Sequence, residues 1–262
     1  MGDARANQAA ALIWDNWRNR SRIAALPESC RPRTVAEGYA AQAELSALSG
    51  WQAVGWKIAA TSAAGQKHIG VAGPLAGRLL DGKLHESGAE LACAHLHMAV
   101  VEAEFVFRLA EDLPPRGQDY SPADVVAATV ALHLGIEVPD SRFEDFTIVG
   151  APQLIADNAC TEYFVLGEAV AESWRDLDLA AHRASLTING ETAAEGIGAN
   201  VLGDPRRALA WLANDRIIQG APLRAGEIIT TGTCIVPAAI KPGDDVVADF
   251  GVMGRVSVRF AA

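Results

Sequence analysis

The chain has 262 residues, half of them hydrophobic, and carries a formal net charge of −10. This is enough apolar sequence to bury a core, and no cluster of Lys and Arg offers a surface for a phosphate backbone. We therefore expect one globular unit, 1–262, with no nucleic-acid partner.

Targeting signals and paired cysteines are missing from the sequence. No uncharged apolar stretch approaches ~20 residues, and the N-terminus lacks the basic-then-apolar order of a secretory signal. The cysteines are widely separated, form no Cys-x-x-Cys pair and are expected to be reduced thiols. They are Cys30, Cys93, Cys160 and Cys234. The sequence predicts a cytoplasmic protein with no membrane partner.

The N-terminal part, 1–83, is expected to be mainly helical. Hydrophobic residues recur at mostly helical spacing over 4–26. A capping box formed by Thr34 and Glu37 begins a second helix, and a short third helix is predicted within 61–70. Two long helices therefore precede the candidate site residues.

From residue 84 onward the pattern favours strands, with helical insertions. Proline at the first helical position predicts helices over 121–132 and 204–220. Asn189-Gly190 is a strong hairpin turn, and the alternation of 256–260 indicates a half-buried antiparallel strand. The expected fold class is α+β, with N-terminal helices followed by a mainly antiparallel β core over 84–262.

The most informative feature is a set of three glutamates in apolar surroundings. Glu102 and Glu104 lie two apart in the apolar run 99–107, so they share one face of a strand, and Glu137 lies in another apolar run. Buried carboxylates without a partner cost several kcal/mol. Carboxylate oxygens suit Mg²⁺ or Mn²⁺, with positions left for water or a chelating substrate. The bland alternative for the Glu-x-Glu pair is a solvated strand face.

Two other motifs bear on this site. His95 and His97, followed by Glu102, imitate the first half of a cupin metal motif, but the flanking glycines and the second motif are missing, which favours surface strand residues. Lys57 lies in an apolar, strand-like segment. Its side chain either reaches water or faces the carboxylates or a substrate, where it could donate a proton.

Further polar segments are ambiguous. In 230–234, which follows a strand, a glycine flanked by hydroxyls could bring backbone N–H groups and Thr233 to a ligand, or it could be a polar turn. Asp157 and the segment 140–142 either support the site or bridge loops internally. The sequence contains no Gly-x-Ser-x-Gly elbow and no Gly-x-Gly-x-x-Gly nucleotide loop.

Taken in order, several segments resemble the 2-oxo-4-pentenoate hydratase and 4-oxalocrotonate decarboxylase family of the fumarylacetoacetate hydrolase superfamily. They are Gly55-Trp56-Lys57 with Thr61-Ser62, Ile69-Gly70-Val71, Glu102-x-Glu104, Glu137 with Asp140-Ser141-Arg142, Ala156-Asp157-Asn158-Ala159, Gly203-Asp204-Pro205 and Lys241-Pro242-Gly243-Asp244.

The resemblance implies a β-roll scaffold and a homo-oligomer, with association with a related pathway enzyme as a further option. It implies Mg²⁺ or Mn²⁺ held by Glu102, Glu104 and Glu137, with Lys57 near the substrate. The residues expected to line the substrate site are Thr61, Ser62, Leu75, Asp157 and Thr233.

Two departures affect the expected reaction. Hydratases of the family often carry an aspartate at the position of Leu75, two residues before Gly77, and Asp81 is the candidate catalytic substitute. Cys160-Thr161-Glu162 stands where the family usually has small residues.

The leading functional hypothesis is a metal-dependent lyase that adds water to a 2-hydroxy-dienoate and gives a 4-hydroxy-2-oxo acid. The alternatives are decarboxylation of a vinylogous 2-oxo acid and hydrolytic C–C cleavage of a β-diketone or acylpyruvate. A non-catalytic partner of such an enzyme is the hypothesis from a different class.

Overall fold

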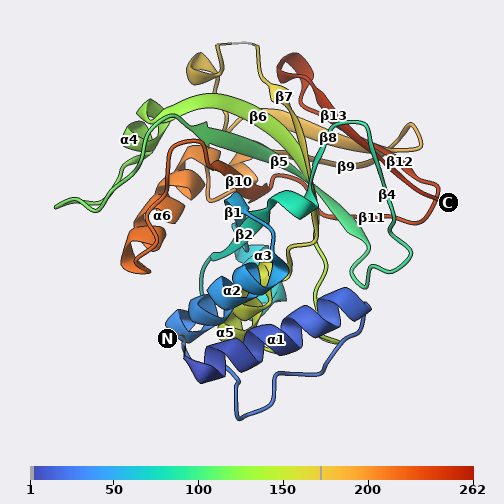
Figure 1. The fold of residues 1–262 in the computed structure, drawn as a ribbon. Helices are drawn as coiled ribbons and strands as arrows, with labels where there is room; N and C mark the ends of the chain where they lie inside the picture. The colour runs from blue at the N-terminus through green and yellow to red at the C-terminus, as the bar shows by residue number, and fades with distance from the viewer. Residues whose placement is uncertain (1–2, 172) are drawn as a thin grey trace.

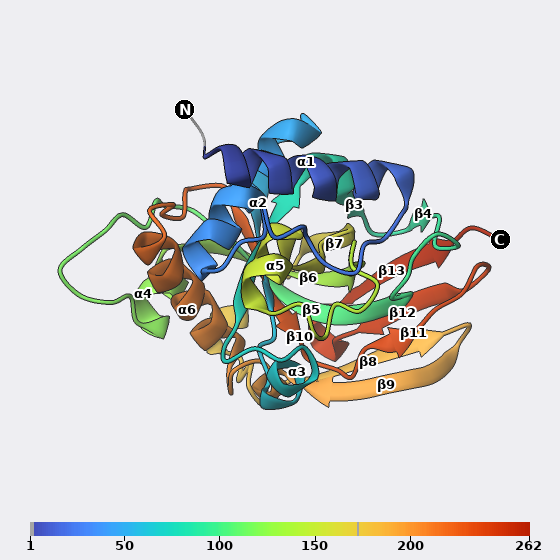
Figure 2. The same cartoon turned by 90° about the horizontal axis from the view of Figure 1, so that it is seen from below.

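The computed structural model describes residues 3–171 and 173–262, which form two β-sheets with helices packed around them (Figures 1 and 2). The helices are α1 Ala4–Asn19, α2 Val35–Ser49, α3 Ala63–His68, α4 Pro122–Ala127, α5 Ala151–Ala156 and α6 Pro205–Ile218. The strands are β1 Ala53–Ala59, β2 Leu75–Leu80, β3 Leu84–Glu86, β4 Ala89–Leu91, β5 Val100–Leu109, β6 Thr129–Val138, β7 Tyr163–Ala169, β8 Arg183–Ile188, β9 Glu191–Ile197, β10 Ile228–Thr233, β11 Ala238–Ala239, β12 Asp245–Asp249 and β13 Arg255–Phe260.

The N-terminal helices begin where the sequence predicts, but the first one is shorter. Thr34 caps α2 by accepting a hydrogen bond from the Glu37 N–H, whereas the Glu37 carboxylate accepts from the backbone N–H of Arg33 and not from that of Thr34, so the predicted capping box forms only in part. The helix predicted over 4–26 ends at Asn19, because Arg20 adopts a left-handed conformation that stops it. Ile23 instead forms a β-bridge with Phe143, which ties this segment to the loop after β6.

The helix predicted over 121–132 is wrong in its second half. Its capping box at Ser121 and Asp124 is present, but α4 ends at Ala127 and β6 begins at Thr129. Residues 129–132 pair with β5, and from His133 onward β6 also pairs with β7. The pairing with β5, in a strand that continues between β5 and β7, outweighs a weak local helix preference.

The larger sheet has the strand order β2-β1-β10-β5-β6-β7-β3, and β11 pairs with β5 beyond this path. Its first two strands come from the N-terminal part, so 1–83 is less purely helical than expected. The strand β1 is buried between β2 and β10, which explains its nearly continuous apolar run. Residues distant in sequence are therefore neighbours in this sheet.

The smaller sheet has the order β4-β13-β12-β8-β9. The predicted hairpin at Asn189 and Gly190 joins β8 to β9, and both turn residues have positive φ, 54° and 84°. The predicted strand over 256–260 lies within β13, which pairs antiparallel with β12. In the described chain, β1 with β10, β3 with β7 and β4 with β13 are parallel pairs, and the other ladders are antiparallel. The fold is thus mixed α/β.

The main core lies between the sheets, where Phe105, Phe107 and Phe250 are fully buried. A second core joins the N-terminal helices to α5 and to the loop after β6, through Ile13, Leu26 and Phe143 among others. Among the residues described, no helix combines the length and apolar character needed to cross a membrane.

Candidate active site

The three glutamates converge on adjacent strands of the larger sheet. Glu102 on β5 lies directly opposite Glu137 on β6, and Glu104 lies two residues further along the same face of β5. One carboxylate oxygen from each lies within 4.8 Å of the other two. Glu104 and Glu137 are buried and Glu102 is partly exposed. The solvated strand face considered for this pair is therefore wrong.

The electrostatics of this cluster call for a cation. Burial, together with the charge of Glu137, raises the pKa of Glu102 to about 8, and Lys57 acts in the opposite direction. Burial and the neighbouring carboxylates also hold the pKa of Glu104 well above its ordinary value. Glu104 Oε1 is buried without a hydrogen-bond partner among the described residues. Three converging hard oxygens with an unsatisfied buried acceptor fit a divalent cation such as Mg²⁺ or Mn²⁺.

Lys57 supplies the chain's own positive charge to the cluster. It lies on β1, 2 % exposed, with Nζ 2.9 Å from Glu137 Oε1. Burial favours neutral lysine, but the charge and hydrogen bond of Glu137, together with the charges of Cys160 and Glu102, outweigh it, and the pKa of Lys57 is raised. The alternative in which the Lys57 side chain reaches water is therefore wrong. The side chain instead carries its proton beside the glutamates.

The irregular last part of β10 positions Glu104. The backbone N–H of Gly232 donates to Glu104 Oε2 at 2.8 Å, at a break in the β5–β10 register. Gly232 has φ +90°, and a Cβ there would lie 2.2 Å from Thr61 Oγ1, so only glycine fits. The sequence suggested that a backbone N–H in this segment could reach a ligand. In the structure the Gly232 N–H donates to the Glu104 side chain instead. Thr233 turns to its own loop and donates to the carbonyl of Ile235.

Asp157 and Arg142 form a buried bridge behind the cluster. Asp157 accepts hydrogen bonds from Ser141 Oγ at 2.8 Å and from Arg142 Nε and N–H. Arg142 also donates to the carbonyls of Asp140 and Thr161, at 2.7 and 2.9 Å. These bonds match the interpretation as an internal bridge between loops, and they fix the loop that follows Glu137. A contact of Asp157 with substrate stays a prediction.

The remaining predicted site residues divide into near and distant ones. Leu75 is buried on β2 opposite Ala59, two residues from Lys57 along the paired strand. Thr61 is buried against Gly232, whereas the Ser62 hydroxyl caps α3 by accepting from the N–H of Gly65.

Asp81 lies apart from the glutamates. Gly77 pairs with Lys57, and Asp81 follows four residues later, roughly 13 Å further along the strand direction. Its exposed side chain accepts a hydrogen bond from the backbone N–H of Gln52. The structure therefore does not bring this aspartate to Lys57, and it does not replace the carboxyl group that Leu75 lacks.

Sequence reasoning missed the left-handed run Asn158–Cys160. All three residues have positive φ, between 50° and 62°, and a Cβ on Gly77 would lie 2.5 Å from the Asn158 carbonyl. Cys160 is buried, and burial raises the pKa of its thiol to about 12, with Lys57 acting in the opposite direction. Only the asparagine gives a sequence signal for this conformation.

The two histidines of the rejected cupin motif lie in the loop between β4 and β5, so their placement on a strand is wrong. His97 Nε2 lies 2.9 Å from the carbonyl of Glu144, and His95 packs its ring against Tyr163. Neither belongs to the group of residues that could hold a metal among those the structure describes.

Comparison with known proteins agrees with this geometry. Residues 88–261 match the family model described as fumarylacetoacetate (FAA) hydrolase C-terminal, and the chain belongs to this family of enzymes. It is 36 % identical over 262 residues to a 2-keto-4-pentenoate hydratase of Paraburkholderia phymatum, covering 99 % of this chain and 98 % of the relative.

A second relative and a solved structure resemble it over nearly the full length. The chain is 34 % identical to a 2-hydroxyhexa-2,4-dienoate hydratase of Comamonas testosteroni, covering 95 % of this chain and 94 % of the relative. Its fold is similar to that of 4-oxalocrotonate decarboxylase from Pseudomonas putida G7, complexed with magnesium and adipate. The TM-score is 0.88, with 30 % identity and 97 % of both chains covered.

Proposed function

We propose that this enzyme is a divalent-metal-dependent hydro-lyase that adds water to a 2-hydroxy-dienoate and yields a 4-hydroxy-2-oxo acid. The observation that carries the proposal is the convergence of Glu102, Glu104 and Glu137 beside a buried, charged Lys57. The hydratases to which the chain is similar support the choice of reaction.

We assign metal binding, orientation of a ligand carboxylate and proton delivery to different residues of the chain. The three glutamates would hold Mg²⁺ or Mn²⁺, which, when bound, supplies a Lewis acid for a substrate carboxylate and its 2-oxygen. The Gly232 N–H orients one ligand carboxylate by holding Glu104 Oε2. Lys57, kept protonated by Glu137, is placed to pair with substrate negative charge or to deliver a proton. The apolar side chain of Leu75 would exclude bulk water from the protonated amine of Lys57.

Decarboxylation of a vinylogous 2-oxo acid is the second candidate. It is favoured by Leu75, since a buried apolar residue stands near Lys57 where hydratases of the family often carry an aspartate. The likeness to a decarboxylase structure supports it as well. Hydrolytic C–C cleavage of a β-diketone or acylpyruvate is the third, because the same chelating site would serve it.

The deciding experiment is an assay of the purified protein, with Mn²⁺ or Mg²⁺, against 2-hydroxy-dienoates, 2-oxo-dioates and acylpyruvates. A 4-hydroxy-2-oxo acid product supports hydration, carbon dioxide release supports decarboxylation, and two smaller acids indicate C–C hydrolysis. Glu104→Gln should abolish metal-dependent turnover, and Glu191→Gln, an exposed carboxylate of the β8–β9 hairpin, should leave it unchanged. Near-normal turnover by Glu104→Gln without added metal would refute the metal site.

We further infer a β-roll architecture of the superfamily type for the two sheets, and a homo-oligomeric enzyme of the cytoplasm. Four free, buried cysteines are consistent with a reducing compartment. Light scattering on the purified protein would test the oligomer.

A further inference from the structure

An apolar cluster adjoins the glutamates on the same face of the larger sheet. Its buried members are Leu75, Leu154, Ile155, Ala159 and Cys160. Leu75 on β2 pairs with Ala59, two residues after Lys57, so the Leu75 and Lys57 side chains project from one face. Burial raises the pKa of the Cys160 thiol and the charge of Lys57 lowers it, which places both ends of the cluster near this lysine. Lys57 in turn contacts Glu137.

The outer part of the apolar cluster is only half-buried. Its hydrophobic side chains come from the loop between α3 and β2, from the residues before β5 and from the loop after β6. They include Ile69, Val71, Met98, Phe146 and Val149. Asp140 joins Met98 to Cys160, because its carboxylate accepts from the Met98 N–H and its own N–H donates to the Cys160 carbonyl. Since β2 and β5 both begin at this end of the sheet, the half-buried surface lies at the same end as the partly exposed Glu102.

The charges of the candidate metal site balance without a spare cation. Burial and Glu137 raise the pKa of Glu102, and among the described residues Lys57 is the only cation that acts against them. With the three glutamates ionised, these four side chains carry two net negative charges, which a bound divalent ion neutralises. A second carboxylate, at the far end of a substrate, would therefore find no opposite charge in the site.

The basic residues of α3 lie outside the apolar cluster. Lys67 and His68 are both exposed, whereas the following Ile69 is half-buried in the cluster. Water and salt screen exposed charges, so these two side chains attract a carboxylate inside the site only weakly.

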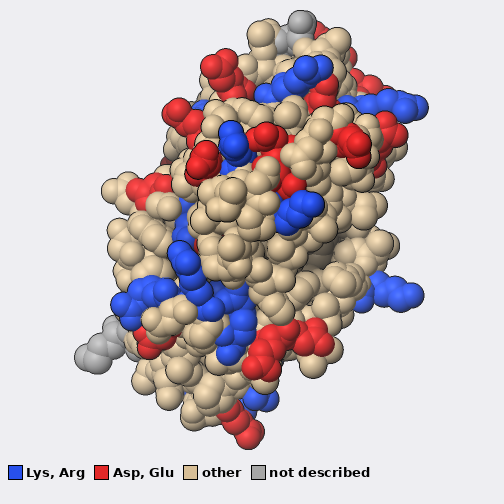
Figure 3. Space-filling model, turned by 90° about the vertical axis from the view of Figure 1, so that its right-hand side faces the viewer, with Lys and Arg blue, Asp and Glu red and all other residues tan. Residues whose placement is uncertain are grey.

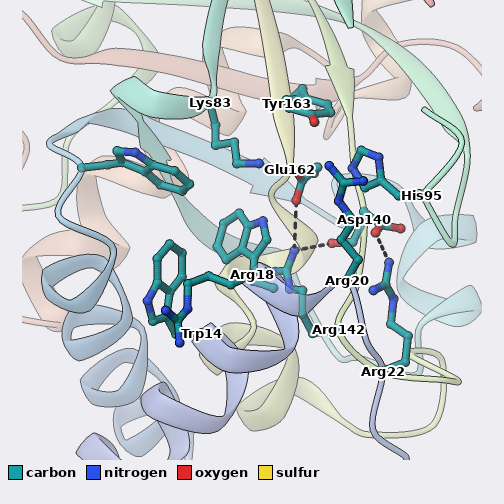
Figure 4. A pocket seen from close by; sticks show the side chains of 12 residues that line it. Trp14, Arg18, Arg20, Arg22, Lys83, His95, Asp140, Arg142, Glu162 and Tyr163 are labelled. Atoms are coloured by element: carbon teal, nitrogen blue, oxygen red, sulfur yellow. Dashed lines mark hydrogen bonds and ion pairs between the residues drawn. The ribbon is translucent and has the colours of Figure 1, made fainter. Parts of the chain in front are cut away.

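Two arginines close to the loop after β6 are already bonded to carboxylates. Arg22 donates to Asp140, the residue that also binds the Met98 N–H, and Arg142 donates to Asp157. Figure 4 shows Arg22 joined to Asp140, with Arg142 beside them. Other basic side chains gather in the lower half of the face on which α1 ends (Figure 3). The charges of Arg22 and Arg142 are therefore neutralised within the chain.

A carboxylate placed against the apolar cluster would lose its water without gaining a partner, whereas a hydrocarbon group would bury apolar area there. We propose that the substrate carries an uncharged hydrocarbon tail that packs on Leu75, Val71 and Met98, and that a second carboxylate at that end is rejected. This inference rests on the proposed chelating site and adds the class of substrate, which is a monoacid and not a dioate. Val71 and Met98 then determine specificity.

The test is calorimetric titration of the full-length, Mn²⁺-loaded protein with 2-oxohexanoate and with 2-oxoadipate. The two probes have chains of equal length and the same chelating end, and they differ at the far end, which is a methyl group in one and a carboxylate in the other. Both are saturated, so neither offers a double bond for the addition of water. We expect 2-oxohexanoate to bind at least about tenfold more tightly.

Three variants connect this preference to the apolar cluster. Met98→Lys puts an ammonium on a side chain of similar length and should reduce the preference for 2-oxohexanoate about tenfold or reverse it. Val71→Lys, at a second half-buried position, should act in the same direction. Ile218→Lys adds the same charge at an exposed position at the end of α6 and should leave the preference unchanged.

The outcomes separate this inference from the proposed function. Equal binding of the two probes, tighter binding of 2-oxoadipate, or an unchanged preference in both Met98→Lys and Val71→Lys would overturn the hydrocarbon tail and leave hydration in place. Binding of neither probe would overturn both, because the chelating site would be absent. A preference for 2-oxohexanoate in a protein that hydrates no dienoate would support the tail and refute the reaction.

Discussion

Replacing Glu104 with glutamine should make the metal-free enzyme more stable while destroying its metal site. A carboxyl group whose pKa is raised in the folded state binds its proton more tightly there than in the unfolded chain. Its presence therefore lowers stability as pH rises above its ordinary pKa of 4.5. The loss is about 1.4 kcal/mol for each pH unit, or at most about 3 kcal/mol at pH 7. Glutamine avoids this loss and keeps an oxygen for the Gly232 N–H.

The assay is urea unfolding in EDTA at pH 5 and pH 7, with Glu191→Gln as the control carboxylate. Glu104→Gln should exceed the wild type in free energy of unfolding by about 1–3 kcal/mol at pH 7, and by much less at pH 5. With metal at 100 times its Kd, only the wild type gains stability, by about 2.7 kcal/mol. This gain reduces the difference in free energy of unfolding between Glu104→Gln and the wild type, or makes the wild type the more stable of the two. A variant less stable than the wild type in EDTA at pH 7, or an equal gain at both pH values, would refute the reasoning.

Three further substitutions test other parts of the structure. Lys57→Met should destabilise the metal-free protein by about 3–5 kcal/mol in urea unfolding, because it leaves a buried carboxylate unpaired, and a cost below 1 kcal/mol would contradict the buried pair. Gly232→Ala should lower stability and Mn²⁺ affinity far more than Gly190→Ala. Both glycines have positive φ, but of the two only Gly232 has a side chain, that of Thr61, within contact distance. Equal melting temperatures of the two variants would contradict the close approach of Gly232 to Thr61. Arg142→Met should also lower the free energy of unfolding by about 3–5 kcal/mol, and wild-type stability would show that the buried bridge is not needed.

The chemistry of the site was readable from the sequence, whereas its geometry was not. Alternation along a strand was enough to place Glu102 and Glu104 on one face. The approach of Glu137 depends on the register between β5 and β6, which are separated by a loop and a helix, and no local pattern encodes that register. Lys57 enters from β1 through a parallel pairing with β10, a contact between segments more than 170 residues apart.

The errors have local causes. The helix predicted over 121–132 is wrong in its second half because residues 129–132 form the start of β6 and pair with β5. Asp81 was proposed from its distance along the chain, but the β1–β2 register carries it away from Lys57. The left-handed run Asn158–Cys160 involves an alanine and a cysteine, residue types that carry no signal for that conformation.

The interleaving of the first two strands into the larger sheet has a consequence for how such enzymes can be recombined. The family match begins at residue 88, yet a chain cut there would lack Lys57 and would leave the β10 backbone, normally paired to β1, as a bare edge. The N-terminal part is therefore no detachable module. A chimera between two relatives should fold only when β1 and β10, which pair with each other, come from the same parent.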